Sequence, residues 1–200
     1  MLKLYGSLNS SAGRCLWLLE ELGVEYEQVA LDFKAGEHKN PEYLKINPNG
    51  KVPTLVHDDF VLWETLAINR YLAKTFAPNL LGQNLADSAL IDQWSLWSVL
   101  HLYLPFSVAM YFAWFKIGEA ESVEKAKTID APPLLKILDD YLAGKEFMVG
   151  GQFSVADINV ASIVNLGARL EFDLSGFSNI TSWLTKMRER EAYQKAALKK

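Results

Sequence analysis

The first thirty residues combine two strand-like patterns with one helix-like pattern of apolar positions. Residues 2–5 alternate apolar and polar side chains, and residues 26–31 form a second strand candidate. Between them, leucines recur at helical spacing from about Ser11 to Leu22, and Gly23 ends the helix. A β-α-β unit of this length predicts two parallel strands joined by a right-handed crossover.

The next elements complete a compact α/β domain. A short helix is followed by two strands at residues 54–56 and 61–63, and the four residues between these strands suit a hairpin. A helix that begins near Leu66 ends before Pro78. The order β-α-β-α-β-β-α therefore predicts an α/β domain over residues 1–78.

The second half of the chain has no strand-like alternation and predicts helices. A linker rich in Pro, Gly and Asn precedes residues 85–200. A long, aromatic-rich helix is predicted over residues 86–117, and Pro105 should kink or split it because proline removes a backbone donor. Pro132-Pro133 should disturb the early part of the next helix. We therefore expect an all-helical domain over residues 85–200.

One helix start in this second domain has a specific signal. Ser154 and Asp157 have the spacing of a capping box, in which each side chain bonds the other residue's backbone N–H. Phe153 and Ile158 lie where a hydrophobic staple would join across the cap. These residues predict a buried helix with a structural role.

Composition and charge narrow the class of protein. The chain has 200 residues, 50% apolar and 22% charged, with a net charge of −4, which fits a globular protein and disfavours nucleic acid as a partner. We find no signal peptide and no uninterrupted apolar run of membrane-spanning length, so no membrane partner is expected. Cys15 is the only cysteine, and the histidines His38, His57 and His101 are far apart. We therefore expect no disulfide and no metal, and a cytoplasmic location.

The turn before the first helix is one candidate for chemistry. It contains Asn9, Ser10 and Ser11, and it lies where free backbone N–H groups and the helix dipole favour an anion. A hydroxyl at this place could donate a hydrogen bond to a thiolate and lower the pKa of that thiol. The alternative is that Ser10 or Ser11 only caps the helix.

Two further segments could offer backbone groups to a ligand. Pro53 leads into a probable inner strand although it cannot donate to the ladder, which fits if the Val52–Pro53 bond is cis and turns the Val52 backbone outward. Glu64 and Thr65 stand at the start of the next helix, where they could hold a ligand's carboxylate and ammonium groups or act only as a cap.

The order of elements and four spaced motifs resemble the cytosolic glutathione transferase family. The motifs are residues 17–26, residues 47–53 with the sequence Asn-Pro-Asn-Gly-Lys-Val-Pro, the pair Glu64-Thr65, and residues 153–157. The resemblance covers nearly the whole chain. It implies a thioredoxin-like first domain that binds glutathione, an all-α second domain with the second-substrate pocket, and a homodimer.

The resemblance also implies roles for individual residues in binding glutathione. Pro53 matches the family's cis-proline, and Val52 matches the residue whose backbone pairs with the cysteinyl part of glutathione. Glu64 and Thr65 match the Glu-Ser pair that holds the γ-glutamyl end, with threonine in place of serine. Two positions match residues that contact the glycine carboxylate in theta- and delta-like members: His38 and Lys51.

For the catalytic position, the resemblance favours Ser10, because theta- and delta-like members carry a serine four residues before an arginine, here Arg14. Asn9 and Ser11 remain alternatives. Some bacterial and fungal members place Asn near this turn and act on disulfides or peroxides. We expect Cys15, which lies inside the helix, to be a packed core thiol rather than the reactive cysteine of glutaredoxin-like members.

The implied activity is a glutathione transferase of cytoplasmic detoxification, in which glutathione is co-substrate and its thiolate attacks a hydrophobic electrophile. Six residues are candidates for the second-substrate pocket, although core packing is the alternative for the helical ones: Leu8, Tyr103, Phe106, Met110, Tyr111 and Trp114. Two other functions stay open, a glutathione-dependent disulfide reductase or peroxidase and a non-catalytic assembly module of the same fold.

Overall fold

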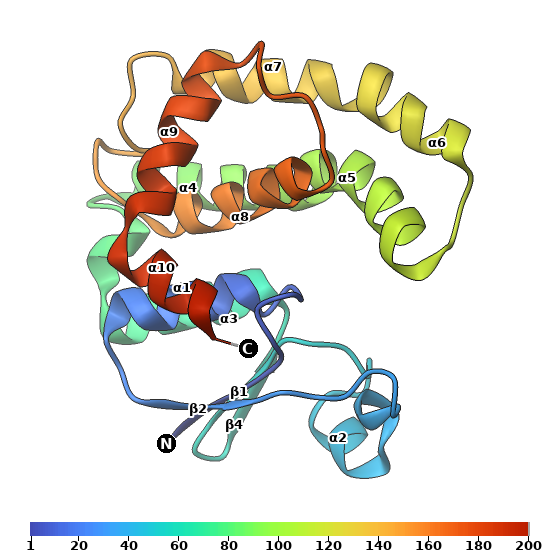
Figure 1. The fold of residues 1–200 in the computed structure, drawn as a ribbon. Helices are drawn as coiled ribbons and strands as arrows, with labels where there is room; N and C mark the ends of the chain where they lie inside the picture. The colour runs from blue at the N-terminus through green and yellow to red at the C-terminus, as the bar shows by residue number, and fades with distance from the viewer. Residues whose placement is uncertain (200) are drawn as a thin grey trace. The chain divides into compact units, whose positions relative to one another are not determined.

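The computed structural model describes residues 1–199 and divides the chain into two compact units, drawn as ribbons in Figure 1. The α/β unit comprises residues 1–80 together with the C-terminal segment that starts at Glu189. The helical unit comprises Leu81–Arg188. The sequence analysis assigned all of residues 85–200 to the helical domain, so the C-terminal segment is a correction to that prediction.

The α/β unit is built on a four-stranded sheet in the order β2-β1-β3-β4. The strands are β1 (Leu2–Tyr5), β2 (Tyr26–Val29), β3 (Thr54–His57) and β4 (Phe60–Trp63). β1 pairs parallel with β2 and antiparallel with β3, and β4 is antiparallel to β3. The predicted parallel pair and hairpin are both present.

The hairpin between β3 and β4 turns at Asp58-Asp59, the two residues that the sequence favours for the turn. His57 pairs with Phe60, so each strand is one residue longer at the turn than expected. Asp58 makes this possible because its φ of 54° lies in the left-handed region, which Asp tolerates better than most side chains.

Side chains of β1 alternate between the two faces of the sheet, and helices of the α/β unit pack on these faces. The buried side chains Leu2 and Leu4 face one side of the sheet, and Tyr5 faces the other, where its ring lies 5.5 Å from that of Tyr43. Tyr43 belongs to α2 (Pro41–Ile46). Three further helices lie beside one another in Figure 1: α1 (Gly13–Leu22), α3 (Thr65–Phe76) and α10 (Glu191–Leu198). Two short 3₁₀ segments complete the unit's connections: Glu37–Lys39 and Pro78–Leu81.

The helical unit begins with one continuous helical run. It consists of α4 (Leu85–Trp97), a π-helical turn (Ser98–Leu102), α5 (Tyr103–Met110) and a second π-helical turn (Tyr111–Phe115). The remaining elements are α6 (Ala120–Lys125), a π-helical turn (Ala126–Asp130), α7 (Ala131–Leu142), α8 (Val155–Arg169) and α9 (Ser178–Glu189).

The prolines of this unit widen the helix rather than split it. A proline lacks the N–H that would bond four residues back, and its ring crowds that carbonyl. The π-helical turn Ser98–Leu102 comes just before Pro105, and the turn Ala126–Asp130 comes just before Pro132 and Pro133. The wider turns accommodate the prolines, so the helical run continues where the sequence predicted a kink or a break.

The run Leu85–Phe115 is long and apolar enough, by length and composition alone, to cross a membrane, with a mean hydropathy of 1.4 over its most apolar stretch. The sequence analysis expected no such run. Its buried side chains, among them Ile91, Trp94 and Leu102, pack inside the helical unit, and α4 and α5 both contact α8. Because a core helix passes the same length and hydropathy test, these properties do not indicate a membrane segment.

The predicted capping box at Ser154 is present and forms the polar centre of the helical unit. The Asp157 carboxylate accepts hydrogen bonds from the Ser154 N–H and hydroxyl at 2.9 Å and from the Met148 N–H at 2.8 Å. The Trp183 indole N–H donates to the same carboxylate at 3.1 Å. Asp157 is completely buried. It therefore joins the start of α8, the loop before it and α9.

Candidate functional site

The first turn of the α/β unit is folded tightly around Gly6, which follows β1. A Cβ at Gly6 would lie 2.5 Å from the Cβ of Ala12 and 3.2 Å from that of Val52, and the φ of Gly6 is +131°. Only glycine fits such a close approach. The Ser10 Oγ would lie 3.5 Å from the same position. Gly6 therefore allows the predicted catalytic turn and the segment before Pro53 to meet.

The hydroxyls of Ser10 and Ser11 have different hydrogen-bond partners. The half-buried Ser10 Oγ donates to the Ser7 carbonyl at 2.7 Å and accepts from the Ala12 N–H at 3.2 Å. The exposed Ser11 Oγ donates to the Val52 carbonyl at 2.9 Å. Neither side chain caps α1 directly. Ser10 holds the turn itself, and Ser11 ties the turn to the segment that precedes Pro53.

The Val52–Pro53 bond is cis, as the sequence predicted, and a buried polar network fixes the loop before it. The Tyr43 hydroxyl donates to the Lys51 carbonyl at 2.6 Å and lies 2.8 Å from the Thr54 hydroxyl. The Asn47 amide donates to the same carbonyl at 2.8 Å and to the Thr54 hydroxyl at 2.9 Å. The backbone of Val52 is therefore held in place from both sides.

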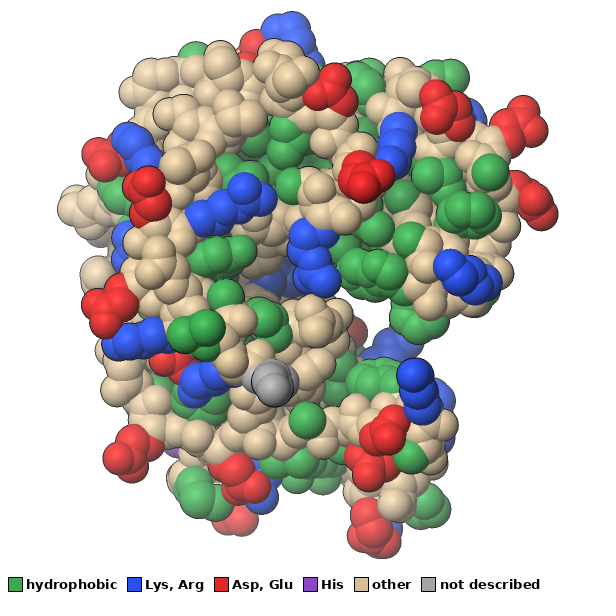
Figure 2. Space-filling model, viewed as in Figure 1, with side chains coloured by type: hydrophobic (Ala, Val, Ile, Leu, Met, Phe, Trp, Pro, Cys, Tyr) green, Lys and Arg blue, Asp and Glu red, His purple; other side chains and the backbone are tan. Residues whose placement is uncertain are grey.

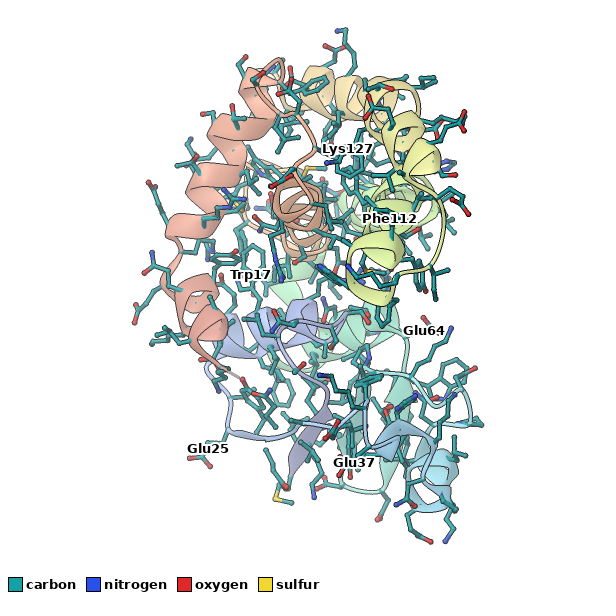
Figure 3. All side chains as sticks on the ribbon, turned by 45° about the vertical axis from the view of Figure 1, so that its right-hand side comes forward. Trp17, Glu25, Glu37, Glu64, Phe112 and Lys127 are labelled. Atoms are coloured by element: carbon teal, nitrogen blue, oxygen red, sulfur yellow. The ribbon has the colours of Figure 1, made fainter. Side chains whose placement is uncertain are left out.

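Glu64 and Thr65 stand at the start of α3, as predicted. Glu64 is exposed, has a φ of 76° and projects away from the strand and helix that flank it (Figure 3). Thr65 is buried, and its carbonyl lies 3.9 Å from the Cys15 Sγ. This contact joins α3 to α1, so the two helix starts are part of one packed layer. The first N–H groups of a helix have no acceptor within the helix, so the start of α3 suits a carboxylate.

Cys15 is a core thiol, as expected. It is completely buried, and burial raises the pKa of its thiol to about 12. A thiol in this state carries almost no thiolate at neutral pH. It is therefore unsuited to the redox role of glutaredoxin-like cysteines.

The segments that carry His38 and Lys51 are in contact. A Cβ at Gly50 would lie 2.8 Å from the His38 carbonyl and 2.7 Å from the Lys39 Nζ, and Lys39 donates to the Asn49 carbonyl at 3.3 Å. The imidazole of His38 stacks on the Phe33 ring, with 4.5 Å between centroids. Lys51 is exposed. The structure thus brings two basic side chains to neighbouring backbone segments.

The aromatic residues predicted to line a second-substrate pocket differ in exposure. Phe106 is completely buried, 4.5 Å from the Phe172 ring, so it packs in the core of the helical unit rather than on an open surface. Tyr103 and Met110 are half-buried and contact each other. Tyr111 and Trp114 are exposed. Leu8 is half-buried in the first turn of the α/β unit, and Asn9 beside it is exposed.

Comparisons with known proteins agree with this geometry. Residues 1–74 match the glutathione S-transferase N-terminal domain, and residues 104–191 match the glutathione S-transferase C-terminal domain. The chain belongs to the glutathione S-transferase family.

Individual members of the glutathione S-transferase family cover almost the whole chain. A probable glutathione S-transferase GSTF2 of Oryza sativa subsp. japonica is 37% identical over 98% of this chain and 95% of its own. Glutathione S-transferase D6 of Drosophila melanogaster is 31% identical over 90% of this chain and 84% of its own. The structure of a theta class glutathione S-transferase from Xanthomonas axonopodis pv. citri, with glutathione bound, has a TM-score of 0.90 and 31% identity, covering 98% of this chain and 97% of its own.

In this member of the glutathione S-transferase family, the sequence analysis missed the buried residues that support the candidate site. It did not identify Gly6 as the point of close approach, or Tyr43, Asn47 and Thr54 as the polar network behind Val52. The available signals were a glycine after β1 and three polar residues near a proline. Neither signal predicts which backbone segments approach each other or which side chains form hydrogen bonds.

The surface of this member of the glutathione S-transferase family has no single dominant charge on the face that Figure 2 shows. On the face that Figure 2 shows, acidic and basic side chains are interspersed with apolar ones. Over residues 1–199, no three His, Cys, Asp or Glu side chains are grouped so that they could hold a metal ion.

Proposed function

We propose that this protein is a glutathione transferase that binds glutathione on the α/β unit and activates its thiol. The observation that carries this proposal is the link between the first turn and the Val52 backbone, made by the hydrogen bond from Ser11 and the close approach at Gly6. A hydroxyl-bearing turn and an outward-facing backbone segment are thereby brought together where a peptide thiol could be held.

In this proposal each part of glutathione meets one part of the α/β unit. The backbone of Val52, next to Pro53, pairs with the cysteinyl residue. Glu64 binds the γ-glutamyl ammonium group, and the backbone N–H and hydroxyl of Thr65 bind its carboxylate. Two basic side chains bind the glycine carboxylate by charge: His38 and Lys51.

The chemistry then needs only a thiolate and an electrophile. The glutathione thiol loses its proton to solvent. The Ser10 hydroxyl, whose single proton is donated to the Ser7 carbonyl in the free protein, turns to donate it to the sulfur anion instead, which lowers the pKa of the thiol. A sulfur lone pair forms the new bond to the electrophilic atom, while that atom's leaving group or π bond takes the displaced electron pair. The Ala12 N–H, which donates to the Ser10 Oγ at 3.2 Å, supports this role by polarising the hydroxyl.

The electrophile binds, in our proposal, on the aromatic end of the long helical run. Tyr111 and Trp114 are exposed there, and the Arg169 guanidinium lies 5.4 Å from the Trp114 ring centre. Exposed aromatic side chains suit a hydrophobic substrate. This substrate class fits detoxification in the cytoplasm.

Retention on immobilised glutathione tests the binding part of the proposal. The wild-type protein is expected to be retained and to be eluted by free glutathione. It is also expected to conjugate glutathione to a hydrophobic aryl halide, measured by the absorbance of the product. Retention without turnover of aryl halides, peroxides or disulfides would favour the non-catalytic module, and no retention would contradict the proposed function.

We further propose that the protein is a homodimer in which a leucine stripe on the helical run is covered by the second copy. The stripe consists of Leu96, Leu100, Leu104 and Val108, which recur every four residues and are all exposed. Leu100 and Leu104 are 59% and 57% exposed. Monomers rarely leave such a continuous apolar surface open to water.

Charged residues introduced into the leucine stripe should dissociate the homodimer into monomers. We expect Leu100→Glu with Leu104→Glu to convert a dimer into a monomer in sedimentation analysis, because two carboxylates would have to be buried without partners. Leu85→Glu, at a highly exposed leucine outside the stripe, is the matched control and should stay dimeric. A wild-type monomer at micromolar concentration would contradict the dimer.

A further inference from the structure

The C-terminal helix α10 is packed against α1, within the α/β unit. Residues 189–199 belong to that unit, and α1 and α10, the first and last helices in Figure 1, are in contact. The match to the family's C-terminal domain ends at residue 191, before almost all of α10. The helix therefore lies almost wholly outside the matched C-terminal domain and packs within the α/β unit.

Two consecutive acidic residues at the end of α1 form ion pairs with basic residues at the two ends of α10. The Glu21 carboxylate accepts two hydrogen bonds from the Arg190 guanidinium, at 2.6 and 2.7 Å, across 169 residues of sequence. The Glu20 carboxylate lies 2.7 Å from the Lys199 Nζ and accepts from the Tyr26 hydroxyl at 2.7 Å. Glu20 and Glu21 are only 15% and 10% exposed, so water screens these pairs less than surface pairs.

An apolar contact lies beside these ion pairs. The Trp17 indole N–H donates to Glu21 at 2.9 Å, and its ring meets the Tyr193 ring of α10 edge-on, with 4.9 Å between centroids. Trp17 is central to the buried stretch of α1 from Cys15 to Leu19, in which every residue is at most 1% exposed (Trp17 is labelled in Figure 3). α10 therefore covers part of α1 that would otherwise face water.

The opposite end of α1 begins at the catalytic turn. Ser10 and Ser11 directly precede the helix, and α1 is only ten residues long. A rigid helix of this length transmits a shift at Glu21 to its first residue, because protein interiors are close-packed. The Ser10 hydroxyl accepts a hydrogen bond from the N–H of Ala12, which stands directly before α1.

From this geometry we infer that Arg190, through its paired hydrogen bonds to Glu21, is a positioning residue for the Ser10 hydroxyl. It acts through α1 and touches neither glutathione nor the reacting sulfur. The inference rests on the proposed function, since it assigns the orientation of a hydroxyl that the proposed function uses. A bidentate guanidinium–carboxylate pair is suited to this because it fixes both distance and angle.

The test compares Arg190→Ala with the wild type in the full chain. We expect the pKa of the bound glutathione thiol, followed by the ultraviolet absorbance of its thiolate, to rise in Arg190→Ala. The kcat at neutral pH should fall about 3- to 10-fold and recover at high pH, because a displaced hydroxyl stabilises the thiolate less. Arg190→Lys, which keeps the charge but loses the paired geometry, should recover part of the loss.

A matched control and a glutathione-independent measurement separate this inference from the proposed function. Lys195→Ala removes a charge from α10 whose salt bridge is with Glu191 of the same helix and which attracts Glu20 only at longer range. It leaves the Arg190–Glu21 pair intact and should leave the thiol pKa unchanged. Hydrogen exchange of the α1 amides should speed up in Arg190→Ala and not in Lys195→Ala. A lower Tm with an unchanged thiol pKa in Arg190→Ala would overturn the inference. A wild type that does not bind glutathione would instead overturn the proposed function.

Discussion

Asp157→Ala is expected to lower the free energy of unfolding by about 4 kcal/mol, the largest stability effect among the substitutions considered for this protein. The carboxylate accepts from the backbone N–H groups of Met148 and Ser154 and from the Trp183 indole, in the core of the helical unit. Alanine leaves all three donors buried without an acceptor, and each unsatisfied donor costs about 1–3 kcal/mol. Denaturant unfolding of the purified protein, or loss of soluble protein on expression, measures this effect.

Asp173→Ala provides the matched control for that prediction. Asp173 also accepts a backbone N–H, that of Ser175, at 2.8 Å, but it does so on the surface. Water replaces the lost acceptor there, so the cost should stay below about 1 kcal/mol. Equal losses for the two alanine variants would show that burial of the Asp157 network adds no stability.

The same carboxylate predicts a pH dependence of stability. Burial raises the pKa of Asp157 from 3.8 to about 6, against the effect of its hydrogen-bond donors. Between these values Asp157 binds more protons in the folded protein than in the unfolded chain, so its contribution to stability is fully present below about pH 4 and is lost as the pH rises through about 6. The difference in unfolding free energy between wild type and Asp157→Asn should therefore shrink over this range. A constant difference would contradict the raised pKa.

Local patterns in the sequence predicted the features that local chemistry determines. The capping box needs only Ser154 and Asp157 at the right spacing. The cis bond before Pro53 was implied by the resemblance to the family, because the position of the proline fits a cis bond without requiring one. Both were found where the sequence placed them. The two further donors to Asp157, from Met148 and Trp183, could not be predicted, because they depend on how the loop and α9 pack against α8.

Features that depend on distant partners were missed or left open. α10 joins the α/β unit because Arg190 meets Glu21, and no local pattern indicates a partner 169 residues away. The helical run around Phe106 is apolar on every side, so periodicity could not tell that Phe106 points into the core while Trp114 is exposed. Only the packing of α5 against its neighbours decides this.

In the candidate site, too, local sequence patterns could be read in advance and contacts between distant residues could not. The residues proposed to bind glutathione could be named from the sequence because they match the spaced motifs of the family, and their roles stay predictions. Their supports could not be named in this way, because the bonds from Tyr43 and Asn47 to the Lys51 carbonyl form only once α2 and the loop have folded together. Which hydroxyl of the first turn faces a bound sulfur is likewise a question of geometry rather than of residue type.

Ser10→Ala is expected to have the largest effect on activity. Hydrogen bonds to charged groups contribute about 1.5–3 kcal/mol, so the pKa of the bound glutathione thiol should rise by about 1–2 units and kcat/KM at neutral pH should fall about 10- to 100-fold. The loss should diminish at high pH, where the thiol ionises without help. Titration of the thiolate absorbance of the enzyme–glutathione complex measures the pKa, and steady-state kinetics across the same pH range measures the rate.

Ser11→Ala is the control that separates the two hydroxyls. Ser11 donates to the Val52 carbonyl, so its loss should weaken glutathione binding and raise KM while the thiol pKa stays as in the wild type. Ser10→Thr, which keeps a hydroxyl, should recover much of the activity that Ser10→Ala loses. If instead Ser11→Ala raises the thiol pKa and Ser10→Ala does not, the catalytic hydroxyl is Ser11. In that case the bonds of Ser10 to the Ser7 carbonyl and the Ala12 N–H serve only to shape the turn.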